Sequence, residues 1–130
     1  MIRIDRSTER FALRMAIEDM GRDLNVSLCG GDSPHIGAVA LAVPRPSLRH
    51  PDLTSASVSV VTVTGHKEDD LARSVGRALA STLGRTVAVS CGIHLDNAAE
   101  REIDQVLQLV SDMVAEAEER LSGPRNEERT

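Results

Sequence analysis

Two short stretches of the sequence combine histidine and carboxylate side chains directly after a glycine, where an apolar run ends. The first is Gly65 to Asp70, after residues 58–64, and the second is Gly92 to Asn97, after residues 86–91. Each stretch precedes a helical pattern. Helix amino-termini present unpaired N–H groups and the positive end of the helix dipole, so an anionic ligand is a suitable occupant. We predict one composite site at the carboxyl ends of two strands.

A phosphate monoester fits these residues well. The backbone N–H groups of residues 65–67 and 95–98, with Lys67, the only lysine in the chain, would surround it. The acidic residues have simpler roles available: Glu68 and Asp69 are expected to stabilise the first turn of their own helix, and Asp96 and Asn97 are candidate helix caps.

Metal chemistry is an alternative for the same stretches. If loop 30–37 lies near the two helix starts, the side chains of His35, His66, His94 and Asp96 would supply enough ligands for zinc or a related metal. Their spacing has no compact signature such as His-x-x-x-His. Cys91 has two interpretations, an activated thiol near His94 or a buried structural cysteine, and burial is the default.

The first half of the chain predicts strands and the second half two helices. Residues 1–8 are expected to be loosely ordered, and residues 44–52 form an exposed loop because they contain three prolines. Alternating or continuous apolar side chains predict five strands. These strands are residues 11–18, 24–29, 35–43, 55–64 and 86–90.

The first helix is predicted from about Glu68 to Leu83, with Gly84 ending it. This helix joins the fourth and fifth strands, which allows them to be parallel in a right-handed crossover. The second helix is long, with Asn97 as its cap and an apolar stripe that continues to Leu121. Its length exceeds what a small sheet covers, so its overhang either packs against a second copy of the chain or is solvated.

Composition limits the class of protein. A chain of 130 residues with 41% hydrophobic residues is expected to be one globular domain, with an ordered core at about 10–122 and a disordered tail at 123–130. A net charge of −5 and a single aromatic residue, Phe11, argue against nucleic acid as a partner. The sequence has no apolar run of membrane-spanning length and no secretory signal pattern, so a cytoplasmic location is expected.

Three motifs, residues 30–39, 65–70 and 92–98, resemble a known family in this order. They are similar to the small accessory protein of gallate decarboxylase, an LpdD-like prenylated-flavin chaperone. The resemblance implies a non-catalytic, usually dimeric protein that binds prenylated flavin mononucleotide (FMN) and passes it to an apo decarboxylase of the UbiD type. By motif position, it implies that the cofactor-binding residues are Gly31, His35, Gly37, Gly65, His66, Lys67, His94, Asp96 and Asn97.

We therefore predict an α+β fold, with a mainly antiparallel sheet of about five strands and two helices on one face. The resemblance implies a fold like that of proteasome assembly chaperones. The leading function is a homodimeric chaperone for prenylated FMN. The alternatives are a metal-dependent enzyme that uses the histidine cluster and an assembly chaperone that binds only protein, through the long second helix.

Overall fold

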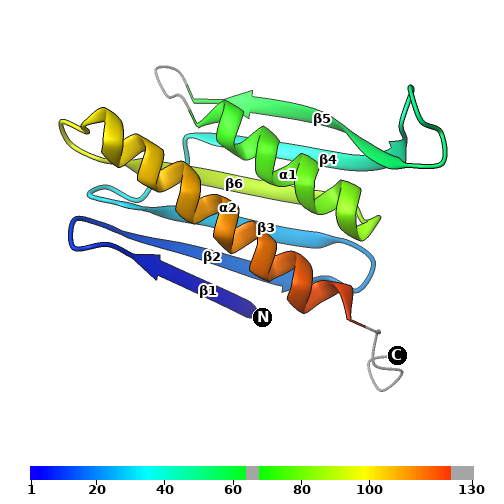
Figure 1. Ribbon diagram of the computed structural model, residues 1–130, viewed down its shortest axis with the longest axis horizontal. Coiled ribbons are helices and arrows are strands. Elements are labelled where there is room, and N and C mark those ends of the chain that lie inside the picture. The colour runs from blue at the N-terminus through cyan, green and yellow to red at the C-terminus, as the bar shows by residue number, and fades with distance from the viewer. Residues whose placement is uncertain (64–67, 124–130) are drawn as a thin grey trace.

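The computed structural model describes residues 1–63 and 68–123 (Figure 1). Three predicted site residues, Gly65, His66 and Lys67, lie outside this part of the chain, as does the predicted tail from residue 124. The described residues form six strands and two helices. In chain order these are β1 (Ile2–Ser7), β2 (Ala12–Asp19), β3 (Leu24–Gly31), β4 (Ala38–Pro46), β5 (Thr54–Thr62), α1 (Asp69–Leu83), β6 (Val87–His94) and α2 (Glu100–Ser122).

The strands form one open sheet in the order β1-β2-β3-β6-β4-β5. Each neighbouring pair is antiparallel except β3 and β6, which are parallel. Figure 1 shows α1 and α2 side by side across one face of this sheet. The predicted α+β class, with two helices on one face of a mainly antiparallel sheet, is confirmed.

The core lies between the helices and the sheet because every second strand residue faces the helices. In β2 these residues are Leu13, Met15 and Ile17, and in β4 they are alanines. The small β4 side chains let α1 come close: a Cβ added to Gly76 of α1 would lie 3.3 Å from the Cβ of Ala42. Close approach of α1 to the sheet therefore depends on small residues on both sides.

The prediction that residues 1–8 are loosely ordered is wrong. They contain β1, which pairs along its length with β2, and Ile4 is only 2% exposed. Arg6 reaches α2, where its guanidinium donates a hydrogen bond to the carboxylate of Glu116. The pattern is hard to see because β1 is an edge strand on which isoleucines alternate with charged residues.

The predicted proline loop is wrong at its start, because β4 continues through Pro46. Pro44 and Pro46 are in register with residues of β5, whereas β6 pairs with β4 from Ala38 to Ala42. After Ala42, the edge of β4 that faced β6 is unpaired. Proline lacks a backbone N–H, but on this unpaired edge no inter-strand hydrogen bond is lost, so Pro44 and Pro46 can belong to the strand.

The β6 strand lies between β3 and β4 rather than beside β5. Because β5 and β6 are both antiparallel to β4, they run in the same direction, as the crossover prediction allowed. They do not pair with each other, since β4 separates them. The first helix has its predicted bounds within one residue and ends at Gly84, whose φ of 64° is left-handed.

The long helix α2 begins later than predicted. Its cap residue is Ala99, not Asn97, and the Glu102 carboxylate accepts a hydrogen bond from the Ala99 N–H at 2.8 Å. Asn97 instead adopts a left-handed φ of 51°, which asparagine tolerates. The predicted overhang is also wrong, because Leu121 still packs against the core. With β1 present, the sheet is wide enough for the helix.

Candidate functional site

The described parts of the predicted motifs meet at one edge of the sheet, where β3, β5 and β6 end and both helices begin (Figure 1). Two contacts bring loop 32–37 to this edge. The Asp32 N–H donates to the His94 carbonyl oxygen at 2.7 Å, and His35 Nε2 lies 2.8 Å from Glu68 Oε1. The loop therefore lies near both helix starts, which is the condition on which the metal alternative depends.

A cleft of about 560 Å³ opens at this edge between the amino-terminal parts of the two helices. Its volume falls within the range of small-molecule sites. Most of its walls are aliphatic, with polar groups from α1 and the end of β6. The residues that line it are Glu68, Asp70, Leu71, Ile93, His94, Leu95, Ala98, Ile103, Val106 and Leu107. Among the predicted site residues that the structure describes, His94 is the one that lines the cleft.

The His35 and Glu68 side chains meet at the start of α1. His35 Nδ1 lies 2.8 Å from the Ser33 carbonyl oxygen, which only accepts, so Nδ1 is the donor of this hydrogen bond. His35 Nε2 lies 2.8 Å from Glu68 Oε1. Glu68 is the cap residue of α1, so it lies at the helix start as predicted, and it is buried there against His35. The pair lies beside the cleft, which Glu68 lines.

Glycine backbones allow the edge loops to approach this closely. A Cβ on Gly92 of β6 would collide with the His35 carbonyl oxygen, and one on Gly37 would lie 2.5 Å from Glu68 Oε2. Gly31 has a left-handed φ of 81°, and a Cβ there would collide with the His94 carbonyl oxygen. The glycines of the motifs thus position the histidines rather than offering side chains of their own.

A second cluster, which the sequence did not reveal, joins three loops to α2. The Arg10 guanidinium donates two hydrogen bonds to the Asp32 carboxylate, at 2.7 and 2.8 Å, and a third to the Asp96 carbonyl oxygen. Its Nε lies 3.3 Å from the Glu102 carboxylate. No spacing rule links these residues, although the Gly30-Gly31-Asp32 motif did mark the loop that holds Asp32.

The Asp32 carboxylate occupies the turn before α2. It accepts a hydrogen bond from the Asp96 N–H at 2.8 Å, a group that the sequence offered to a phosphate. The hydrogen bonds from Arg10 and from this N–H hold the pKa of Asp32 well below its usual range, and the pKa of Arg10 is raised. The Asp96 side chain instead contacts His94, with Oδ1 3.0 Å from Nε2.

Other predicted chemistry finds less support at this edge. Cys91 is fully buried, and burial raises the pKa of its thiol to about 12, so the activated-thiol interpretation is wrong. The His35 and His94 rings meet edge to face with centroids 6.4 Å apart. Residues 1–63 and 68–123 contain no group of three or more His, Cys, Asp or Glu side chains placed to hold a metal; His66 lies outside these ranges.

The fold and the site define a two-layer α+β domain with a ligand-sized cleft at the amino-termini of its helices. The model of the prenylated flavin chaperone LpdD-like family matches residues 7–122, from the end of β1 to the end of α2. The chain belongs to this family. A search of curated proteins found no match. Neither described helix combines the length and the apolar character needed to span a membrane.

Proposed function

We propose that this protein is a non-catalytic carrier that binds prenylated FMN as cargo and delivers it to an apo decarboxylase of the UbiD type. The observation that carries the proposal is the aliphatic cleft of about 560 Å³ at the helix amino-termini, in a chain whose family is described as a prenylated flavin chaperone. The cleft offers a binding volume, and the family description names the class of ligand.

The proposed position of the ring system is between α1 and α2. Leu71, Ile103 and Leu107 supply apolar contacts from the two helices. The only aromatic side chain, Phe11, is buried in the core, so the ring rests on aliphatic walls rather than on a stacked aromatic residue. In this proposal His94 and Glu68, which line the cleft, hydrogen-bond the polar edge of the ring, and His35 holds the Glu68 carboxylate.

The proposed position of the phosphate is the start of α1. Gly65, His66 and Lys67 directly precede Glu68 in the sequence and supply N–H groups and a cation. The other helix start is less suitable, because Asp32 already accepts the Asp96 N–H. In this proposal Gly31, Gly37 and Asn97 shape the backbone around the cargo, and Asp96 orients His94.

A carrier must release its cargo unchanged. The cleft is open, since Ile103 and Leu107 are each about half exposed, and the buried Cys91 thiol is unsuited to attack a bound ring. Both cysteines are free thiols, which fits the reducing cytoplasm proposed as the location. We also propose a homodimer, which buries the sheet face that lacks helices.

The test is a native mass spectrum and a visible absorbance spectrum of protein purified without oxygen after co-production with a flavin prenyltransferase. The polypeptide does not absorb in the visible range, so any visible band reports a bound chromophore. A mass increment of prenylated FMN is expected for the wild type. Leu107→Arg, in the cleft wall, should abolish it, whereas Gln105→Arg, exposed on the same helix, should keep it.

A colourless apo protein would contradict cargo binding, and a metal-sized increment alone would support the metal-dependent alternative. Delivery has a separate test. Loaded carrier mixed with an apo UbiD-type decarboxylase should lose the cofactor mass as the decarboxylase gains activity. If free prenylated FMN activates the enzyme equally fast and completely, the protein is not needed for delivery.

A further inference from the structure

The Arg10 clasp consists of Arg10, Asp32, Asp96 and Glu102, which come from four separate segments. Arg10 lies between β1 and β2, Asp32 between β3 and β4, Asp96 between β6 and α2, and Glu102 in the first turn of α2. Four contacts of 2.7 to 3.3 Å radiate from one guanidinium to the other three residues. The clasp therefore fixes the start of α2 relative to two neighbouring loops.

Two carboxylates of the clasp, those of Asp32 and Glu102, each contact two partners. Asp32 Oδ2 accepts from both Arg10 and the Asp96 N–H, while Glu102 places one oxygen on the Ala99 N–H and the other near Arg10. Removing Arg10 would thus loosen the turn as well as the helix start. Both segments bear cleft residues, because Ala98 precedes α2, and Ile103 and Val106 lie in its first two turns.

We infer that Arg10 is a positioning residue, which preforms the α2 wall of the cleft before cargo binds. The identity of the cargo in this inference rests on the proposed function. A wall held in its binding position does not have to be ordered when the ligand enters, so less binding free energy is lost. Without the clasp, the start of α2 moves more freely and the cargo binds more weakly.

The clasp should make a modest contribution to global stability. The Arg10 and Asp32 side chains are 38% and 28% exposed, but their hydrogen bonds are bidentate and belong to a network, the case in which partly exposed ion pairs do stabilise a fold. A planar guanidinium is needed because its two terminal nitrogens bind the Asp32 carboxylate while its Nε lies near Glu102. A lysine ammonium makes fewer of these contacts, so Arg10→Lys should be intermediate.

The test compares Arg10→Gln with Arg120→Gln. Arg120 pairs with Glu116 at 3.3 Å near the other end of α2, so it is a matched loss of an arginine ion pair. Arg10→Gln should weaken prenylated FMN binding by roughly tenfold and speed amide hydrogen exchange at residues 100–103 by more than its loss of global stability explains. Arg120→Gln should change neither the affinity nor the exchange at residues 100–103.

Unchanged exchange at residues 100–103 in Arg10→Gln would overturn the inference, whether or not the wild type binds cargo. Faster exchange with unchanged cargo affinity would also overturn it. If Arg10→Gln does not fold, Glu102→Gln replaces it, because its amide oxygen still accepts the Ala99 N–H while its charge toward Arg10 is lost. If the wild type binds no prenylated FMN, the proposed function is wrong. The exchange measurement then tests only whether Arg10 holds the start of α2 in place.

Discussion

At the scale of single residues, close backbone contacts at the sheet edge hold the site together. Gly92 of β6 lies directly under the His35 carbonyl oxygen, and Gly37 lies against the Glu68 carboxylate. These contacts leave no room for a methyl group. The paired position of His35 and Glu68 therefore depends on residues that have no side chain.

Gly92→Ala should displace loop 32–37 and destabilise the protein by about 1–3 kcal/mol, because backbone must move to admit the new Cβ. Urea unfolding measures this cost. Ser90→Ala, two residues earlier on the same strand, should change stability by no more than about 0.5 kcal/mol. Equal stability of Gly92→Ala and the wild type would show that the loop yields without cost.

The Arg10–Asp32 pair also gives a pH dependence. The pKa of Asp32 is lowered by folding, so its contribution to stability is complete above its unfolded pKa of about 3.9 and is lost as the pH falls toward the folded pKa. The stability difference between the wild type and Asp32→Asn should therefore be constant near neutral pH and shrink below about pH 4. A difference that persists unchanged into acid would contradict the pairing.

The sequence predicted the meeting of the edge motifs but not their partners. Glycines and histidines at strand ends are local signals, and they suggested the cluster in which the His35 and His94 rings lie 6.4 Å apart. Arg10 gave no such signal. Arg10 contacts Asp32 22 positions away and Asp96 86 positions away, and only the fold brings them together. Glu68 lies at a helix start as predicted, but its pairing with His35 could not be read from the sequence.

At the scale of elements, helices and strands with strong periodic patterns could be predicted. The edge strand β1 and the end of β4 that pairs on one side could not. The two helices and the central strands carry long apolar patterns, and all were predicted, but their bounds differ by up to four residues. The strand predicted at 35–43 is Ala38–Pro46, and the one predicted at 86–90 is Val87–His94. The β1 strand was missed because its exposed charged residues dominate a short segment. Pro44 and Pro46 were assigned to a loop because pairing on one side of β4 cannot be read from the sequence.

Ile4 tests whether β1 belongs to the core. It is 2% exposed and belongs to the main hydrophobic cluster, so Ile4→Ala should cost about 2–5 kcal/mol. The control Ser7→Ala, exposed on the same strand, should be nearly neutral. Thermal or urea unfolding distinguishes the two. A neutral Ile4→Ala would mean that the amino-terminal segment is as loosely held as the sequence suggested.

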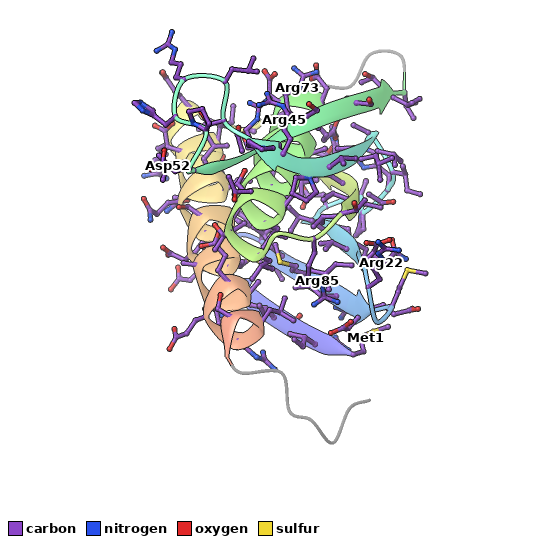
Figure 2. All side chains as sticks on the ribbon, turned by 90° about the vertical axis from the view of Figure 1, so that its right-hand side faces the viewer. Met1, Arg22, Arg45, Asp52, Arg73 and Arg85 are labelled. Atoms are coloured by element: carbon purple, nitrogen blue, oxygen red, sulfur yellow. The ribbon has the colours of Figure 1, made fainter. Side chains whose placement is uncertain are left out.

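At the scale of the whole molecule, one face of the sheet has no helix layer. Figure 2 shows the two layers edge-on, with the helices to the left and the bare face of the sheet to the right. The strands β4 and β5 carry an apolar strip on this face, whereas β1 and β2 carry a charged strip. The apolar strip is Val39, Leu41, Val43 and Val61, and the charged strip is Arg3, Asp5, Arg14 and Glu18.

The proposed homodimer can bury this face by packing sheet against sheet. A twofold axis parallel to the strands would place the apolar strip on the partner's charged strip, which is costly. An axis across the strands places apolar on apolar and reverses the strand direction. If this axis also crosses β2 near its middle, Glu18 of one copy lies over Arg14 of the other, which would pair opposite charges.

Leu41→Glu should convert the dimer to a monomer, because Leu41 is 47% exposed in the apolar strip. Leu48→Glu, in the exposed loop after β4, should leave the dimer intact. Arg14→Glu should weaken the dimer, and Glu18→Arg added to it should restore association. Mass measurement by light scattering follows each step. A monomeric wild type, or a dimer that Leu41→Glu does not affect, would contradict this interface.

The parallel pairing of β3 with β6 also has a consequence for how the chain folds. It joins Leu24 to Val87 and separates two antiparallel groups, β1-β2-β3 and β4-β5, that form from local contacts. Long-range pairing is slow because a long loop must close before contacts repay its entropy. The cleft residues Ile93 and His94 lie at the end of β6, and Leu95 follows it, so we expect the cleft to form only after this long-range pairing is complete.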